Sequence, residues 1–390
     1  MSKLSVDFAG LKLKNPIIAA SAPPTETVGN IIKCAEAGIG AVITKTSADF
    51  NPNKYILGGR RTYVNSKGMW IQGTFRRETL TIKQGCTLVS ESAKKVSIPI
   101  IASVGGLTLD PKDWLDSCLA MQDAGANMIQ LDLFYVPQPR CAPENMQKLR
   151  SLLIHLTSHL DIPVAPKMNN DIPAYYAAEI LKGTGISAVF LMDSLRVPVP
   201  IDIYREGLSQ IPYLKGASEC SLFGEWQKPL TLQYTSILYQ KLKLPICAGG
   251  GLENGWDAIE AMMWGANTVQ FASSIIRHGY SQINKIRKQI TTFLQDKKDY
   301  SHISDIAGLA HRHVHWDKDE SFLPAHVLVN NNLCINCGLC TEIVFCEDIF
   351  LDKNGKVDIG KSCDGCGLCT TVCPISGALE VHSIKSYIQK

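Results

Sequence analysis

Eight short, apolar, β-rich runs recur along the first 272 residues, and helical stretches separate them. The runs are Pro16–Ala20, Ala41–Thr46, Ile98–Ser103, Met128–Leu133, Ile162–Lys167, Ala188–Met192, Pro245–Gly249 and Thr268–Ala272. Strands as uniformly apolar as these are typical of parallel sheets that helices cover on both faces. Several runs follow a helix stop, such as Ala124-Gly125 or Trp264-Gly265. The pattern predicts an α/β fold, a TIM (β/α)8 barrel, with a doubly wound sheet as the alternative.

The C-terminal part of the chain carries a second constraint, since eight of the fourteen cysteines fall in the last sixty residues. One run, from Cys363 to Pro374, has the C-x2-C-x2-C-x3-C-P spacing of bacterial ferredoxins, in which the fourth cysteine ligates the other cluster. A second triplet lies upstream, and five residues instead of three separate its third thiol from the fourth, with no proline following. Zinc sites and disulfides have other spacings or contexts.

The spacing therefore predicts a bacterial-type ferredoxin domain with two [4Fe–4S] clusters, and the crossing rule assigns the ligands. One cluster would take Cys334, Cys337, Cys340 and Cys373, and the other Cys346, Cys363, Cys366 and Cys369. We expect the barrel over residues 1–300, a connector over 301–326 and the ferredoxin-like domain over 327–390.

Composition narrows the class of protein. The net charge of +3 gives no basic field of the kind that nucleic-acid binding needs. No run of eighteen apolar residues predicts a membrane span, and the N-terminus has no apolar signal-peptide core. These features, with thiols at cluster spacing, predict a cytoplasmic location.

The ends of the predicted barrel strands carry the residues that would bind a ligand. Gly249-Gly250-Gly251 closes the seventh strand and Ser273-Ser274 follows the eighth, where barrels bind phosphate through backbone N–H groups. Lys45 and Lys167 each close a buried strand, which is costly unless an anion or a polar ligand meets the ammonium group. A phosphate-bearing ligand at the barrel mouth is predicted.

These residues, with Asn15-Pro16, Thr44-Lys45-Thr46, Ala165-Pro166-Lys167 and the cysteine tail, give the chain a recognisable pattern. The chain resembles the flavin-dependent dihydroorotate dehydrogenase / dihydropyrimidine dehydrogenase family over nearly its whole length. The resemblance implies an FMN barrel, with Lys167 at the flavin N1/O2 edge. It implies a flavin-contacting set of Ala20, Ser21, Lys45, Thr46, Ser103 and Ser194, and a phosphate-binding set of Gly224, Gly250, Gly251, Ser273 and Ser274.

The chain departs from the family pattern at three positions. The family has a ring-binding asparagine at the end of the fourth strand and another at the end of the sixth, where this chain has Asp132 and Asp193. Ionised carboxylates only accept hydrogen bonds, so we expect a substrate richer in donors than a pyrimidine, or one aspartate held protonated. Tyr135 replaces the family's acid/base cysteine and is a serviceable proton donor; Cys141 is the alternative. With Lys45, these residues form the candidate catalytic set: Tyr135, Cys141, Lys45, Asp132 and Asp193.

The predicted activity is an FMN- and iron–sulfur-dependent oxidoreductase that transfers hydride to or from a C=C or CH–CH bond of a small conjugated or cyclic substrate. A dihydropyrimidine dehydrogenase subunit and a non-catalytic electron-transfer subunit are the alternatives. No G-x-G-x-x-G fingerprint opens a helix, so the predicted electron partner is a ferredoxin or a separate NAD(P)H-oxidising flavoprotein subunit. Family barrels often pair, so a homodimer is an expectation from resemblance alone.

Overall fold

The structure is a computed structural model that describes residues 3–49, 61–64, 70–73, 79–136, 142–211, 219–314 and 325–383. The chain divides into two compact units, Met1–Val314 and His315–Lys390. Within the described ranges, no helix has both the length and the apolar character needed to cross a bilayer.

The first unit is a closed barrel of eight parallel strands, which confirms the predicted barrel and excludes the doubly wound sheet. The strands follow one another around the barrel in chain order: β3 (Ile17–Ala19), β4 (Ala41–Ile43), β7 (Ile100–Gly105), β8 (Met128–Asp132), β9 (Val164–Met168), β10 (Val189–Leu191), β15 (Ile246–Ala248) and β16 (Thr268–Phe271). Every residue of these strands is buried, because the barrel interior covers one face and the helices cover the other.

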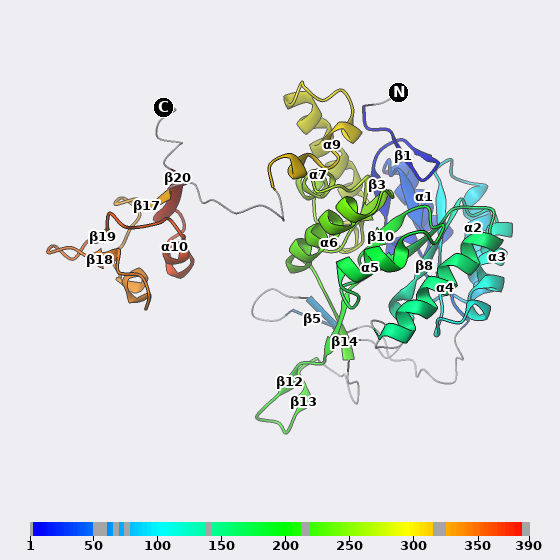
Figure 1. Cartoon of the computed structure of the whole chain (residues 1–390), viewed down its shortest axis with the longest axis horizontal. Helices are drawn as coiled ribbons and strands as arrows, with labels where there is room; N and C mark the ends of the chain where they lie inside the picture. Colours follow the sequence, from blue (N-terminus) through cyan, green and yellow to red (C-terminus); the bar gives the residue numbers. More distant parts are fainter. Residues whose placement is uncertain are drawn as a thin grey trace. The chain divides into compact units, whose positions relative to one another are not determined.

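Helices surround the barrel in Figure 1. They are α1 (Val28–Glu36), α2 (Ile82–Ala93), α3 (Leu115–Asp123), α4 (Pro143–His159), α5 (Ala174–Leu181), α6 (Lys228–Lys241), α7 (Gly255–Met263), α8 (Ser273–His278) and α9 (Ser281–Asp296). The predicted glycine stops end α3 and α7, where Gly125 and Gly265 have φ of 97° and 116°. Only glycine adopts this backbone without strain, so each helix ends there and the chain turns into the next strand.

The two longest βα connections contain strands that the sequence did not reveal. β5 (Arg61–Val64) and β6 (Trp70–Gly73) belong to the connection after β4, and β11 (Leu195–Pro198) and β14 (Glu219–Phe223) to the one after β10. These four form one antiparallel sheet in the order β11-β14-β6-β5. A hairpin of β12 (Ile201–Asp202) and β13 (Leu208–Ser209) projects beyond β14, away from the barrel (Figure 1).

The ends of the first unit add to its core. A hairpin of β1 (Val6–Phe8) and β2 (Leu11–Leu13) sets the Phe8 ring edge-on to Phe190 of β10, with 5.6 Å between centroids. Two 3-10 turns, η6 (Ile303–Ile306) and η7 (Leu309–Arg312), follow α9, and Ile303 and Ile306 are fully buried in the same core.

The second unit is small and built around its cysteines. β17 (Ala325–Val329) pairs antiparallel with β20 (Leu379–Ser383), and β18 (Ile349–Leu351) pairs with β19 (Val357–Ile359). Two short helical turns, η8 (Leu339–Glu342) and α10 (Leu368–Val372), each contain the third cysteine of a triplet. Val327, Ile349, Val357 and Leu379 form the apolar core with Cys340 and Cys369.

Candidate active site

Three charged residues meet where β8, β9 and β10 end. Asp132 is the last residue of β8 and pairs with Lys167 of β9. Lys167 in turn pairs with Phe190 of β10, and Asp193 comes shortly after the end of that strand. Parallel strands end at one rim of a barrel, and this is the rim at which barrel enzymes place their chemistry. The structure therefore brings together three residues that the sequence predicted separately as site residues.

Lys167 and Asp193 form a buried ion pair. Lys167 Nζ lies 2.6 Å from Asp193 Oδ2, and the two side chains are only 7% and 24% exposed. Burial opposes both charges, but the attraction outweighs it: the pKa of Lys167 lies above its usual value and the pKa of Asp193 below. Ser194 also donates to Asp193 Oδ1 from its backbone N, at 2.7 Å, and from its hydroxyl, at 3.1 Å. Asp193 is therefore ionised at neutral pH.

The pKa of Asp132 is shifted in the opposite direction from that of Asp193. Its side chain is almost fully buried; Thr46 Oγ1 is 2.7 Å from Oδ2, and Phe134 N–H donates to Oδ1 at 3.2 Å. Burial, followed by repulsion from Asp193, raises the pKa of Asp132 despite the attraction of Lys167. Burial and Asp193 raise the pKa of Asp132, whereas Lys167 and Ser194 lower the pKa of Asp193, and titratable groups whose pKa values are pushed apart are typical of active sites.

A group of hydroxyls adjoins Asp132. Thr46 Oγ1 lies 2.9 Å from Ser21 Oγ and 3.0 Å from Ser103 Oγ, and Ser103 Oγ donates to Gln130 Oε1 at 3.2 Å. Gln130 is fully buried, and its Nε2 has no hydrogen-bond partner among the described residues. Sequence reasoning missed Gln130, although a polar side chain in an otherwise apolar strand was a signal that could have found it.

The remaining members of the predicted flavin set lie on the same rim. Ala20 is buried directly after β3, Lys45 is half-buried after β4, and Ser194 is half-buried after β10. They thus come from three of the connections that follow strand ends.

Tyr135 lies in η4 (Leu133–Tyr135), the 3-10 turn that follows β8. Its side chain is 7% exposed, and a Cβ added to Gly105 would lie 3.1 Å from both the Tyr135 ring and Thr46 Cγ2. Sequence reasoning also missed Arg196, whose guanidinium donates to Phe134 O and lies 4.8 Å from the centre of the Phe134 ring. Cys141, the alternative acid/base, lies outside the described residues.

The glycine-rich turns after β14 and β15 pack against each other. Gly250 and Gly251 have φ of 97° and 81°, and Gly224 has 124°. A Cβ on Gly251 would lie 2.3 Å from the backbone N of Lys228, at the start of α6, so this approach needs glycine. Among the described residues, nothing accepts a hydrogen bond from the backbone N–H of Gly250 or Gly251.

The two serines that follow β16 face a glutamate from the neighbouring turn. Ser274 Oγ donates to Glu253 O at 2.6 Å, and Ser273 Oγ donates to Glu253 Oε1 at 3.3 Å. Arg277 pairs with the Glu253 carboxylate and lies 3.3 Å from Glu225 Oε1. Sequence reasoning did not find Glu253 or Arg277, because nothing in the local pattern relates them to each other.

In the second unit, the eight cysteines gather around two hollows. One is lined by Cys334, Cys337, Cys340 and Cys373, and the other by Cys346, Cys363, Cys366 and Cys369. No three His, Cys, Asp or Glu side chains in the described ranges are close enough to share a single metal ion. A [4Fe–4S] cluster makes a different demand, because its four thiolates bind four separate irons around one volume.

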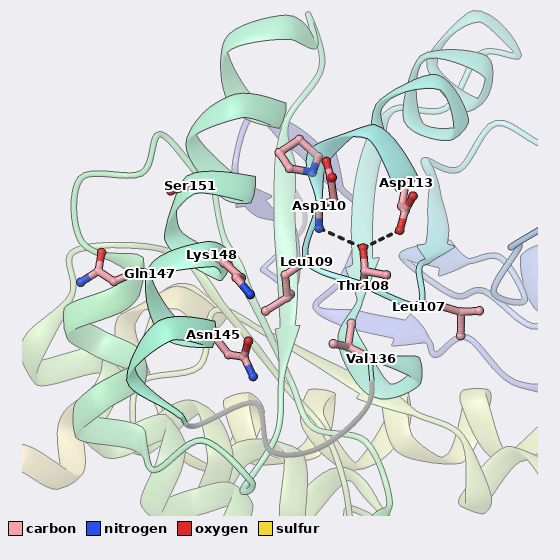
Figure 2. Close-up of a pocket in the computed structure, with 11 residues that line it drawn as sticks. Leu107, Thr108, Leu109, Asp110, Asp113, Val136, Asn145, Gln147, Lys148 and Ser151 are labelled. Atoms are coloured by element: carbon pink, nitrogen blue, oxygen red, sulfur yellow. Dashed lines mark hydrogen bonds between the residues drawn. The ribbon is translucent and has the colours of Figure 1, made fainter.

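A further hollow of about 980 Å³ lies beside the connections that follow β7 and β8 (Figure 2). It is lined by residues of the loop between Leu107 and Asp113, by Val136, and by residues near the start of α4, including Asn145 and Lys148. The Thr108 hydroxyl donates a hydrogen bond to the Asp113 carboxylate and accepts one from the backbone N–H of Asp110, as Figure 2 shows. None of the predicted flavin or acid/base residues that the structure describes lines this hollow.

Comparison with known proteins decides the family. Residues 3–294 match the family model described as dihydroorotate dehydrogenase. The chain belongs to the dihydroorotate dehydrogenase family. As a member, it is a flavin-dependent oxidoreductase that acts on CH–CH bonds.

Relatives in the family differ in how much of the chain they match. A putative dihydroorotate dehydrogenase A (fumarate) from Aeropyrum pernix is 25% identical over 80% of this chain and 98% of its own length. A dihydroorotate dehydrogenase B (NAD(+)) catalytic subunit from Methanocella arvoryzae is 29% identical over 80% of this chain and 98% of its own length. The NAD-dependent dihydropyrimidine dehydrogenase subunit PreA of Escherichia coli is 25% identical over 98% of this chain and 96% of its own. Only the last of these three spans the cysteine unit as well.

Proposed function

We propose that the chain is an FMN- and iron–sulfur-dependent oxidoreductase. Its first unit would be the FMN barrel, and its second a ferredoxin-like domain with two [4Fe–4S] clusters. The observation that carries the proposal is the gathering of the eight cysteines into two sets of four, each set joining three cysteines of one loop with the fourth of the other. This matches the crossed ligation of two-cluster ferredoxins. We name the site of Cys334, Cys337, Cys340 and Cys373 site I, and that of Cys346, Cys363, Cys366 and Cys369 site II.

The barrel residues fit FMN. The backbone N–H groups of Gly250 and Gly251 lack acceptors among the described residues, as does Gln130 Nε2, and a phosphate and a flavin ring would supply acceptors. The proposed ring contacts are Ala20, Ser21, Lys45, Thr46, Ser103, Lys167 and Ser194, and the proposed phosphate contacts are Gly224, Gly250, Gly251, Ser273 and Ser274. Bound FMN supplies hydride chemistry that also proceeds in the one-electron steps that clusters carry.

The charge states of the two aspartates determine which hydrogen-bond donors and acceptors the substrate needs. A protonated carboxyl group has one O–H donor and one carbonyl acceptor, so neutral Asp132 can serve a ring edge much as an asparagine amide does. Ionised Asp193 only accepts, so it requires an N–H or O–H on the substrate. We therefore propose a small conjugated or cyclic substrate with at least one donor group, reduced at C=C or oxidised at CH–CH, with Tyr135 as the proton donor in the reduction and its phenolate as the proton acceptor in the reverse direction.

A second candidate, a dihydropyrimidine dehydrogenase subunit, has specific support. The PreA subunit matches 98% of this chain, and a neutral Asp132 removes part of the objection to a pyrimidine ring, since it can donate to a carbonyl. A separate NAD(P)H-oxidising flavoprotein subunit or a ferredoxin would then be the electron partner.

The test uses anaerobically purified full-length protein. FMN, iron and acid-labile sulfide are measured first, and the photoreduced flavin is then mixed with uracil, thymine, acidic enones or hydroxylated cyclic enones while its absorbance is followed. Prompt reoxidation by uracil or thymine would establish the second candidate, and reoxidation by an enone the first. A chain without flavin would refute both. Tyr135→Phe is the matched control, because it removes the proposed proton donor and keeps the ring.

A further inference from the structure

The two cysteine triplets share a backbone feature at the same position. Gly338 and Gly367 follow the second cysteine of their loops and have left-handed φ of 76° and 78°. Thr341 and Thr370 each donate a backbone hydrogen bond to the carbonyl of that glycine, at 2.9 and 3.0 Å. Because this part of the backbone matches, side chains are the first candidates for an electrostatic difference between the two sites.

The exposure of the cysteines themselves does not distinguish the sites. In each set of four, the second cysteine of the triplet is exposed (Cys337, Cys366), the third is buried (Cys340, Cys369) and the other two are half-buried. The cysteine ligands of the two sites therefore match in exposure.

The charges around the sites differ. Site I is lined, besides its cysteines, by apolar residues: Ile335, Val357, Pro374, Ile375 and Leu379. Site II has three carboxylates in its lining, Glu347, Asp348 and Asp364, and no described cation among its lining residues. Reduction adds an electron to a cluster, and nearby negative charge opposes that addition.

Asp364 has a second effect. Its Oδ1 accepts a hydrogen bond from the backbone N–H of Cys366 at 3.0 Å, so this N–H is not available to a cluster sulfur. The equivalent residue in the other loop is Ile335, and no described residue accepts from the N–H of Cys337. Hydrogen bonds to cluster sulfurs favour the reduced form, so the loss of one acts in the same direction as the added charge.

We propose that the two clusters have unequal reduction potentials, with the site II cluster the lower, and that Asp364 is the residue that most separates them. The inference rests on the proposed function, since it requires both clusters. The first electron to enter the unit is then held at site I and the second at site II. A mild donor loads only site I, whereas a stronger reductant loads both sites and supplies the electron pair that reduction of a C=C bond consumes.

The experiment is a redox titration of the anaerobic full-length protein with dithionite, followed by electron paramagnetic resonance of the reduced clusters. We expect two resolved steps. Asp364→Ile copies the site I loop and should raise the lower step while leaving the upper one in place. Ile335→Asp should lower the upper step alone. Asp364→Asn removes the charge but keeps an acceptor for the Cys366 N–H, so its shift should be smaller than that of Asp364→Ile. Ile335→Asn is the uncharged control and should shift the upper step less than Ile335→Asp.

The outcomes are distinguishable. A protein that holds two clusters reduced in a single step refutes the inference and leaves the proposed function intact. So does a titration in which Asp364→Asn and Asp364→Ile leave the lower step unmoved, or in which Ile335→Asp moves the lower step. A protein that takes up no iron or sulfide refutes the proposed function, and the inference with it.

Discussion

Replacing each aspartate of the barrel rim by asparagine should have unequal effects on stability. Asp193→Asn removes the counter-ion of Lys167. For two unit charges 2.6 Å apart, an effective dielectric constant of about 20 gives an attraction of about 6 kcal/mol. Desolvation of the pair offsets part of this attraction. We expect a net loss of about 3 kcal/mol in the free energy of unfolding, roughly a hundredfold in the unfolding equilibrium.

Asp132→Asn replaces a carboxyl group whose pKa is raised by burial and by repulsion from Asp193, so its neutral form is favoured more than in an ordinary aspartate. The amide has nearly the same shape and keeps an acceptor for Thr46 and Phe134, so we expect a change of less than about 1 kcal/mol. The sign with pH follows from the raised pKa of Asp132: as the pH rises from the ordinary aspartate pKa to the raised folded-state pKa, the unfolded parent ionises first, so the parent loses stability and the variant gains relative to it, and above the raised pKa the difference stays constant.

The assay is urea unfolding of the full chain followed by tryptophan fluorescence, since fully buried Trp114 reports on the barrel. The Asp193→Asn loss should be constant between about pH 6 and 9, because the pKa of Asp193 is lowered and that of Lys167 is raised, away from this window. The ion pair should weaken only in acid, as Asp193 protonates, or in strong base. Equal losses for the two variants, or a larger loss for Asp132→Asn, would contradict the assignment of Asp193 as the main counter-ion of Lys167.

Three further outcomes follow from the structure. Tyr135→Phe should slow substrate-dependent reoxidation of the flavin by roughly a hundredfold or more with unchanged flavin content; an unchanged rate would remove Tyr135 as the proton donor. Gly250→Ala places a Cβ 2.8 Å from Met192 Cγ at a φ of 97°, so FMN should bind at least tenfold more weakly, as fluorescence titration of apoprotein would measure; equal affinity would contradict the proposed phosphate site. Cys373→Ala should remove about half of the iron while sparing the cluster of Cys363, Cys366 and Cys369, and loss of that cluster instead would refute crossed ligation.

The sequence by itself determined the architecture of the first unit. The eight apolar runs became the eight barrel strands, because a strand buried on both faces must be apolar throughout. Glycine stops marked the ends of α3 and α7 for an equally local reason, since the left-handed backbone there favours glycine. The grouping of the cysteines also follows from spacing, because a short loop of fixed length limits where each thiol can lie.

Only the tertiary structure decided the features that depend on distant residues. The sheet β11-β14-β6-β5 joins strands from two connections that lie on either side of four barrel strands in the sequence, so neither segment alone indicates it. Asp132 meets Thr46, 86 residues earlier, and Asp193 meets Lys167, 26 residues earlier. A carboxyl group's charge depends on its burial and on the neighbours that the fold supplies. Two aspartates that look alike in the sequence therefore have pKa values shifted in opposite directions, upward for Asp132 and downward for Asp193.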